Sequence, residues 1–287
     1  MACGGEANPS FAQIAARAAE LCAVAETHAP DPAALAYVIG TEVPVPGGET
    51  EEPDALDVTS VDRLHETLRT HRDAWAARDL TAAWGRIVAV VTQPGVDFGH
   101  TSVYPFVPEK AAPLGEAILE EDGLAFEAHS TDYQPDAALA DLVRGHFFFL
   151  KVGPELTFRF REAVLALGTI EEVLALPDPS RIAAVLDDRM LAVPNHWQAY
   201  YRGTQDEQRL LRTYGYSDRI RYYWTDPFVA AALEKLLANL SAQPLSETLV
   251  SQAFMALDFD AIPHTPEALI NLHVQRCIDR YRIACGQ

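Results

Sequence analysis

The sequence lacks the features that define several large classes of protein. Its 287 residues include four cysteines, at positions 3, 22, 277 and 285, and no two of them have CxxC or zinc-knuckle spacing. It contains no run of about 18 apolar residues, so we expect no membrane-spanning helix. The first residues show no basic segment followed by an apolar one, so a secretory signal is not indicated. These absences predict a cytoplasmic protein with reduced thiols.

Basic residues are also scarce. Lys and Arg number 22 against 41 Asp and Glu, which gives a formal net charge of −19. This balance argues against a nucleic-acid partner, because phosphate binding needs a basic face. The sequence has neither GxxxxGK[ST] nor GxGxxG, so a nucleotide site is not indicated. The hydrophobic share of 49% is that of an ordinary globular protein.

Four short apolar runs predict strands in the first three-fifths of the chain. Continuous apolar runs are typical of parallel strands. Helical patterns alternate with them, which predicts βαβ units and an α/β fold. The predicted strands are 35–40, 87–91, 124–129 and 147–152, and the predicted helices are 11–27, 61–78, 135–145 and 154–174.

After residue 176 the sequence predicts helices alone. They are expected at 180–191, 226–240, 246–255 and 265–283. Thr265 followed by Pro266 is a typical helix start. We therefore expect a first unit at residues 1–176 and a C-terminal helical extension at 177–287, divided at the turn Pro177–Pro179.

Each predicted strand delivers a polar residue at its carboxyl end. These residues are Glu42, Gln93, His129 and Lys151, and Glu127 shares a strand face with His129. In the fourth strand Lys151 is expected to share a face with the residues at 147 and 149. Parallel α/β folds build their sites at this end of the sheet. The sequence therefore predicts that these side chains meet at one rim.

Two kinds of chemistry fit this rim. His129 and Glu42 are candidate ligands of a divalent metal such as Zn²⁺, which would act as a Lewis acid on a carbonyl or enediolate. Lys151, flanked by apolar residues, is a candidate for a Schiff base or for a cation that binds phosphate. We take Glu42, Glu127 and Lys151 as the catalytic candidates. Structural alternatives remain: Lys151 in an ion pair with Glu127 or Glu42, and Glu127 hydrogen-bonded to His129.

Four residues after the strands are candidate substrate-binding residues: Gln93, Ser130, Thr131 and Gly153. Gly153 leads into a predicted helix, whose free N–H groups would favour a phosphate. The alternative for Gln93 is that it caps a turn at Pro94–Gly95. Tyr216–Trp224 is rich in Arg and aromatic residues, which indicates either an interface or a half-buried helix with an Asp218–Arg221 pair.

The stretches that carry a resemblance to a known family include Tyr37–Glu49, Gln93–Asp97, Glu127–Pro135, Leu150–Glu155, Ser217–Thr225 and Arg280–Gln287. In these stretches the sequence resembles the non-catalytic, Z-type subunit of class II D-tagatose-1,6-bisphosphate aldolase. The resemblance implies a TIM-type (β/α) barrel followed by a C-terminal helical region. Met1–Gly5 resembles the segment after the fourth barrel strand, so we expect a truncated barrel with only its last four βα units, open at the edges formed by the first and fourth predicted strands.

The resemblance implies an accessory subunit that stabilises or activates the catalytic class II aldolase subunit. That subunit cleaves tagatose bisphosphate in galactitol, tagatose or amino-sugar catabolism. The alternative is a metal-dependent C4-epimerase that interconverts fructose 6-phosphate and tagatose 6-phosphate. The expected partners are the catalytic subunit and a sugar phosphate, in an oligomer. The family has also carried a tagatose 6-phosphate kinase label, for which the sequence offers no nucleotide motif.

Overall fold

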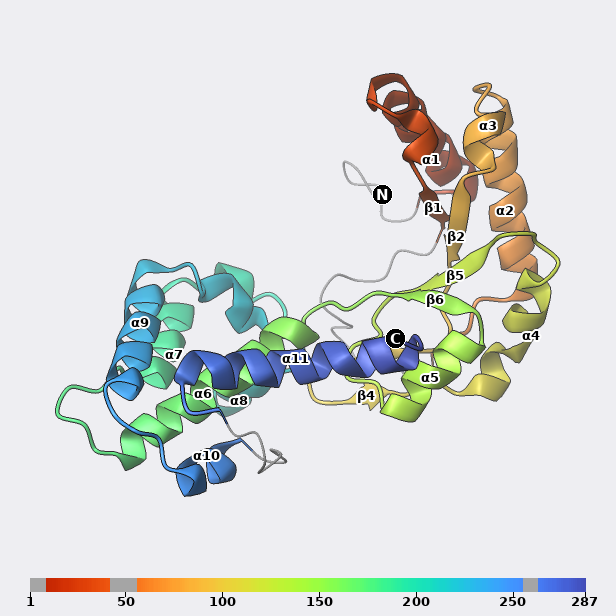
Figure 1. Ribbon diagram of the computed structural model, residues 1–287. Coiled ribbons are helices and arrows are strands. Elements are labelled where there is room, and N and C mark those ends of the chain that lie inside the picture. The colour runs from red at the N-terminus through yellow and green to blue at the C-terminus, as the bar shows by residue number, and fades with distance from the viewer. Residues whose placement is uncertain (1–8, 42–55, 255–262) are drawn as a thin grey trace.

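The protein has an α/β fold with a parallel sheet at one end and a group of helices at the other (Figure 1). The computed structural model describes residues 9–41, 56–254 and 263–287. The four-stranded sheet has the order β1-β2-β5-β6, and every neighbouring pair in it is parallel. The four predicted strands are therefore confirmed, and β1 and β6 form the sheet edges as expected. The strands are β1 Tyr37–Gly40, β2 Ile87–Val91, β5 Ala125–Ala128 and β6 Phe147–Leu150, with a separate antiparallel pair, β3 Asp97–Phe98 and β4 Val103–Tyr104.

The predicted helices are also present, with bounds that differ by a few residues at most. Thr265 caps the last helix by accepting a hydrogen bond from the Ala268 N–H, and Pro266 is its first residue. The α-helices are α1 Phe11–His28, α2 Val61–Ala76, α3 Thr81–Trp84, α4 Pro108–Ile118, α5 Asp136–Arg144, α6 Glu155–Val173, α7 Ile182–Ala192, α8 Gln205–Tyr214, α9 Pro227–Ser241, α10 Glu247–Ala253 and α11 Pro266–Ala284. Of these, α3, α4 and α8 were not predicted.

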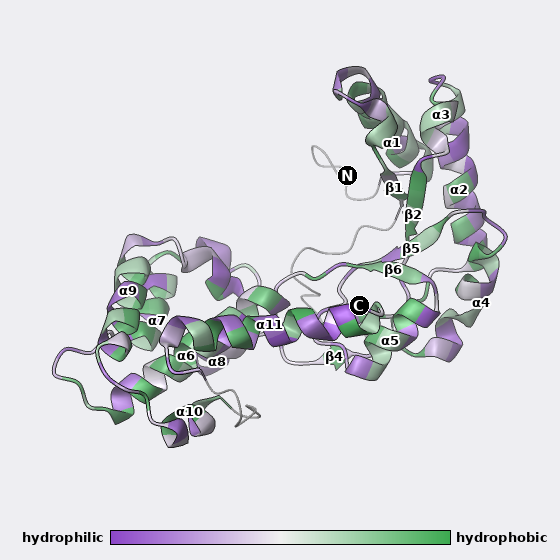
Figure 2. Cartoon of the chain, in the orientation of Figure 1, coloured by the Kyte–Doolittle hydropathy of each residue, from purple (hydrophilic) through white to green (hydrophobic). Residues whose placement is uncertain are grey.

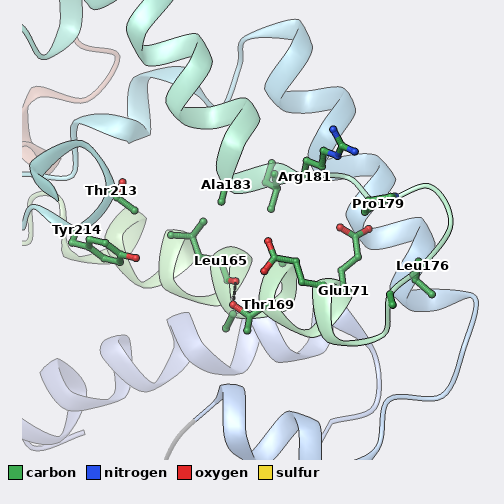
Figure 3. Close-up of a pocket in the computed structure, with 14 residues that line it drawn as sticks. Leu165, Thr169, Glu171, Leu176, Pro179, Arg181, Ala183, Thr213 and Tyr214 are labelled. Carbon is green, nitrogen blue, oxygen red and sulfur yellow. Dashed lines mark hydrogen bonds between the residues drawn. The ribbon is translucent and has the colours of Figure 1, made fainter. Parts of the chain in front are cut away.

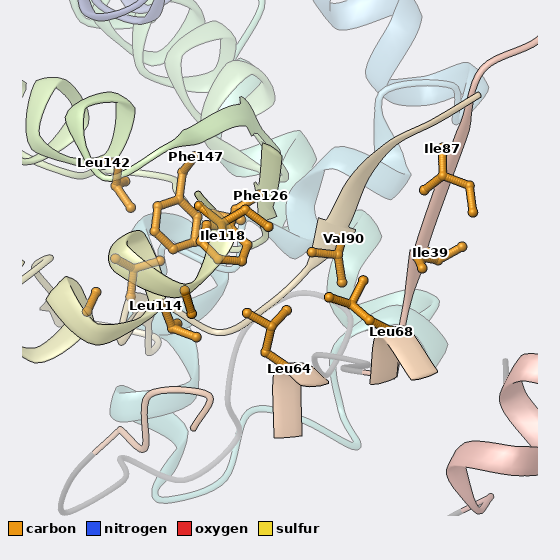
Figure 4. Close-up of a cluster of buried hydrophobic side chains, with 14 of the residues drawn as sticks. Ile39, Leu64, Leu68, Ile87, Val90, Leu114, Ile118, Phe126, Leu142 and Phe147 are labelled. Carbon is orange, nitrogen blue, oxygen red and sulfur yellow. The ribbon is translucent and has the colours of Figure 1, made fainter. Parts of the chain in front are cut away.

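One hydrophobic cluster fixes which face of the sheet is covered by helices. The alternate β5 residues Phe126 and Ala128 point into it, and the rings of Phe126 and Phe147 stack there with centroids 4.8 Å apart. The same cluster contains side chains of three helices that cover this face, Leu64 and Leu68 of α2, Leu114 and Ile118 of α4 and Leu142 of α5 (Figure 4), together with residues of α1. Because successive residues of a strand face opposite ways, Glu127 next to Phe126 lies on the other face.

A bulge in β6 changes the expected facing of its residues. Phe126 pairs with Phe147 and the next residue, Glu127, pairs with Phe149, so Phe148 is an extra residue in the strand. The prediction that Phe147 shares a face with Phe149 and Lys151 is therefore wrong. Phe147 lies in the core, whereas Phe148 and Phe149 are 56% and 40% exposed.

A second hydrophobic cluster joins helices from α6 onward. It begins at Ala163 of α6 and includes side chains of α7, α9, α10 and α11. Apolar and polar residues alternate along these helices (Figure 2), as expected for helices with one buried side. Tyr281 near the end of α11 packs against the first cluster, so α11 contacts both cores. The division at residue 176 stays a prediction. In the parts of the chain that the structure covers, no helix is long and apolar enough to cross a membrane.

The buried histidine of α2 should make stability depend on pH. His71 is fully buried, its Nδ1 contacts the Thr67 carbonyl oxygen at 2.8 Å, and its Nε2 has no hydrogen-bond partner among the described residues. Burial lowers the pKa of His71 below its ordinary value.

Because the unfolded chain takes up this proton at higher pH than the folded one, stability should fall as pH drops below about 6.5, by at most about 1.4 kcal/mol per pH unit. Urea unfolding at several pH values measures how the free energy of unfolding depends on pH. In His71→Leu the part of this dependence that comes from the histidine should be absent. Parallel curves for the two proteins would contradict it.

Candidate functional site

The carboxyl end of the sheet brings together three of the predicted side chains. His129 Nε2 lies 2.9 Å from Glu127 Oε1, and Lys151 Nζ lies 3.5 Å from Glu127 Oε2. Glu127 comes from β5, and the other two follow β5 and β6 directly. The Glu127 side chain is 6% exposed, but that of Lys151 is 57% exposed, so the apolar residues that flank Lys151 in the sequence do not bury its side chain. The two contacts match the structural alternatives stated for these residues: Lys151 forms an ion pair with Glu127, and Glu127 is hydrogen-bonded to His129.

The predicted metal site lies partly outside the described residues. Glu42 falls in the segment that the structure does not describe, and His129 Nε2 contacts Glu127. Within the described ranges no group of three His, Cys, Asp or Glu side chains has an arrangement that could hold a metal ion. His129 and Glu42 together would supply two protein ligands, fewer than the three that catalytic zinc sites use. The assignment of His129 and Glu42 as ligands stays a prediction, and we derive no step through a metal.

The Gln93 side chain caps the turn that follows β2. Its Oε1 accepts hydrogen bonds from the Gly95 N–H at 2.8 Å and the Val96 N–H at 3.0 Å. Its own main-chain N–H donates to Thr59 Oγ1 at 2.8 Å. This is the turn-capping alternative. Its role in substrate binding stays a prediction.

Gln93→Ala should therefore destabilise the fold. Two main-chain N–H groups would lose their acceptor, at a cost of about 1–2 kcal/mol in the free energy of unfolding. Gln93→Glu keeps an acceptor oxygen and should cost less. Chemical denaturation of the three proteins measures this, and equal stability of Gln93→Ala and the wild type would refute the turn-capping role.

The loop after β5 uses the N–H groups that were predicted to hold a phosphate. Asp132 accepts hydrogen bonds from the Gly153 N–H at 2.9 Å and the Glu155 N–H at 2.8 Å. Burial raises the pKa of Asp132 to about 6, so the group is mostly an anion at pH 7. A carboxylate thus sits at the start of α6, where helix N–H groups favour negative charge.

The other two predicted residues of this loop have internal roles as well. Thr131 Oγ1 donates to the Lys151 carbonyl oxygen at 2.8 Å, and Ser130 has a left-handed backbone with φ of 55°. Thr131 is fully buried. The binding of substrate by Ser130, Thr131 and Gly153 stays a prediction.

A buried carboxylate that was not among the candidates organises this loop. Glu155, with no exposed surface, accepts hydrogen bonds from the Tyr133 N–H at 2.7 Å and the Tyr281 hydroxyl at 3.0 Å. It also pairs with Arg159 and with Arg280 of α11, each at 3.1 Å. The C-terminal helix therefore fixes the loop beside the rim. No spacing of residues indicated this contact, although Arg280 and Tyr281 lie in a stretch that carries the resemblance.

The segment 216–224 is largely buried. Arg219–Tyr223 form a 3₁₀ helix, and the Arg219 and Tyr223 side chains are buried. The predicted Asp218–Arg221 side-chain pair is wrong: Arg221 Nη1 donates to the Asp218 main-chain oxygen. The Asp218 carboxylate, turned by a left-handed backbone, pairs with Arg161 at 3.1 Å. This supports the half-buried interpretation.

The cavities of substrate size in the described residues include two along α6 and a larger one, of about 760 Å³, between α1 and α2. One of about 620 Å³ lies between α6 and α7 and is lined by Leu165, Thr169, Arg181 and Tyr214, among others (Figure 3). A second of the same volume lies along the preceding turns of α6. The Glu171 carboxylate at the first cavity is already held by Ser180 and Asn239. None of these three cavities is lined by Glu127, His129 or Lys151, the charged side chains of the rim.

The fold and the rim define an α/β protein whose parallel sheet presents a carboxylate, an imidazole and an ammonium group at its carboxyl end. The chain belongs to the family described as D-tagatose-1,6-bisphosphate aldolase subunit GatZ/KbaZ-like, which matches residues 1–286. The resemblance found in the sequence is thereby confirmed.

Two of the solved structures that match this chain differ widely in their similarity to it. A probable tagatose 6 phosphate kinase from Sinorhizobium meliloti is 38% identical, with a TM-score of 0.87 over 99% of this chain and 71% of that one. A fructuronate-tagaturonate epimerase, UxaE, from Cohnella laeviribosi is 13% identical, with a TM-score of 0.36 over 93% of this chain and 47% of that one. The second likeness is too low to carry an argument.

Proposed function

We propose that the protein is a non-catalytic, accessory subunit that stabilises or activates the catalytic subunit of a class II tagatose-1,6-bisphosphate aldolase. Membership of the aldolase-subunit family supports this role. The process it serves would be the catabolism of galactitol, tagatose or amino sugars, with a sugar phosphate as the substrate of the complex.

The polar network at the rim, in which Glu127 and the N–H groups at the start of α6 already have partners, is the observation that supports this proposal. Glu127 is engaged by His129 and Lys151, and the N–H groups at the start of α6 are engaged by Asp132. A general acid or base must reach a proton of its substrate within hydrogen-bond distance. A carboxylate that is 6% exposed and already paired twice is better suited to holding the rim in shape.

We also propose that the four strands form one arc of a (β/α) barrel. They are parallel, adjacent in chain order and covered by α1, α2, α4 and α5 on one face, which is the outer layer of such a barrel. The predicted truncation of that barrel stays a prediction. The family favours the aldolase-subunit role over the C4-epimerase alternative, which we do not carry further.

Co-purification tests the association. The chain should be captured with a tagged catalytic class II aldolase subunit and should raise its rate of tagatose bisphosphate cleavage several-fold. An unrelated protein of similar size and negative charge is the control. Absence of capture together with an unchanged cleavage rate would overturn the proposal.

His129→Ala separates the accessory role from catalysis by this chain. The side chain is partly exposed and contacts Glu127 through one nitrogen, so its removal should leave the fold and the binding intact. We expect the variant to raise the aldolase rate as the wild type does. A variant that binds equally well but gives no rate increase would show that the rim takes part in the chemistry.

A further inference from the structure

Two buried carboxylates join the rim to the helix that follows it. The rim loop, residues 129–135 after β5, meets the start of α6 at Asp132 and Glu155, which are 1% and 0% exposed. Asp132 accepts a hydrogen bond from the Glu155 N–H at 2.8 Å, and Glu155 accepts one from the Tyr133 N–H at 2.7 Å. Each carboxylate therefore holds the main chain beside the other.

The two carboxylates differ in what balances their charge. Glu155 pairs with Arg159 and Arg280, each at 3.1 Å. Among the described residues Asp132 forms no ion pair, and its partners are the main-chain N–H groups of Gly153 and Glu155. Because burial without a cation disfavours the charged form of a carboxylate, Asp132 is the group in this contact that is suited to take up a proton.

The surroundings of Asp132 fix the direction of its response to pH. Burial raises the pKa of Asp132 to about 6 against the opposing effect of its two N–H partners, and the Glu155 charge adds to the rise. The phenols beside it belong to Tyr133 of the rim loop and Tyr281 of α11. Burial raises the pKa of both tyrosines, so the phenols stay neutral while Asp132 titrates.

We propose that Asp132 is a pH-sensitive switch: one proton taken up in mild acid removes its repulsion of Glu155 and tightens the contact of the rim loop with α6 and α11. The protonated carboxyl group still has an oxygen that accepts hydrogen bonds. The change reaches α11 because the Tyr281 hydroxyl contacts the Thr131 carbonyl oxygen at 2.9 Å and Glu155 Oε2 at 3.0 Å. The switch does not depend on the accessory role.

The contact also sets how firmly a rim side chain is placed. Thr131 Oγ1 donates to the Lys151 carbonyl oxygen at 2.8 Å, so the rim loop is attached to the end of β6. Ser130 and Tyr133 have left-handed backbones with φ of 55° and 62°, a conformation that is uncommon outside glycine. The loop therefore relies on its contacts for its shape, and a tighter contact holds Lys151 more rigidly.

Urea unfolding of the full chain tests the switch. Asp132→Asn keeps an acceptor oxygen but cannot take up the proton. The folded wild type binds this proton at higher pH than the unfolded chain does, so it should gain stability as pH falls through 6. Relative to the variant, its unfolding constant should fall about tenfold from pH 7 to pH 5. Both proteins contain His71, so its opposite effect cancels. Asp188→Asn, at an exposed position of α7, is the matched control and should give a constant ratio.

Two further measurements locate the proton. The ¹³C resonance of the Asp132 carboxyl group in the wild type should titrate with a midpoint near pH 6, which needs no variant to fold. Amide hydrogen exchange of the rim loop, referenced to Asp132→Asn at the same pH, should slow several-fold from pH 7 to pH 5. A midpoint below pH 4.5, a constant unfolding ratio, or rim-loop exchange that does not change would each overturn the switch. No aldolase subunit is present, so these outcomes are distinguishable from failure of the proposed function.

Discussion

Glu155→Ala should lower the free energy of unfolding by about 3–5 kcal/mol, the range seen when one partner of a buried ion pair is removed. The Glu155 carboxylate has no exposed surface and receives hydrogen bonds or ion pairs from Tyr133, Arg159, Arg280 and Tyr281. Its removal leaves two guanidinium groups without their shared partner. Urea unfolding followed by circular dichroism measures the loss.

Two variants show whether the charge is responsible. Glu155→Gln keeps an acceptor for the Tyr133 N–H and should lose less stability than Glu155→Ala. Arg282→Ala removes the exposed pair with Asp279 on the same helix, at 3.2 Å, and should cost less than about 1 kcal/mol. If Glu155→Ala cost no more than Arg282→Ala, the buried network would not be what holds α11 to the loop.

Arg161→Ala should have an effect of similar size, again about 3–5 kcal/mol. Arg161 is 2% exposed and pairs with Asp218, which has no exposed surface. It also lies over the ring of Phe158, 4.0 Å from the centroid. Burial raises the pKa of Asp218, and Arg161 opposes that rise, so the variant leaves a buried carboxylate without its cation.

The pH dependence of the stability lost in Arg161→Ala shows whether the loss comes from charge. Without Arg161 the pKa of Asp218 should rise further, so the folded variant takes up a proton at higher pH than the unfolded chain does. The stability difference from the wild type should then shrink as pH falls. A constant difference between pH 8 and pH 4 would contradict a charge origin and indicate lost packing alone.

The sheet could be predicted from the sequence because its strands are short, continuous apolar runs that are bounded by turn residues. The alternation of side chains along a strand predicts that Phe126 and Glu127 lie on opposite faces, and Phe126 is the one in the core. The bulge at Phe148 could not be predicted, because three consecutive Phe residues carry no alternation. Two-residue strands such as β3 are likewise too short to leave a pattern.

The missed helices and contacts have other causes. Pro113 lies inside α4 and hides its helical pattern. In α8 a signal was present, because Thr204 and Glu207 form a capping box, a spacing that marks a helix start. The contact of Glu155 with Arg280 joins residues 125 positions apart. A single sequence shows which residues are charged but not which distant partner each one meets.

The rate of thermal inactivation of a catalytic class II aldolase subunit tests the central claim most directly. Measured with and without an equimolar amount of this chain, its half-life should lengthen several-fold when the chain is present, because a ligand that binds the folded state stabilises it. His129→Ala and Lys151→Ala should give the same extension as the wild type. An unchanged half-life at saturating concentrations of the chain would contradict the accessory role.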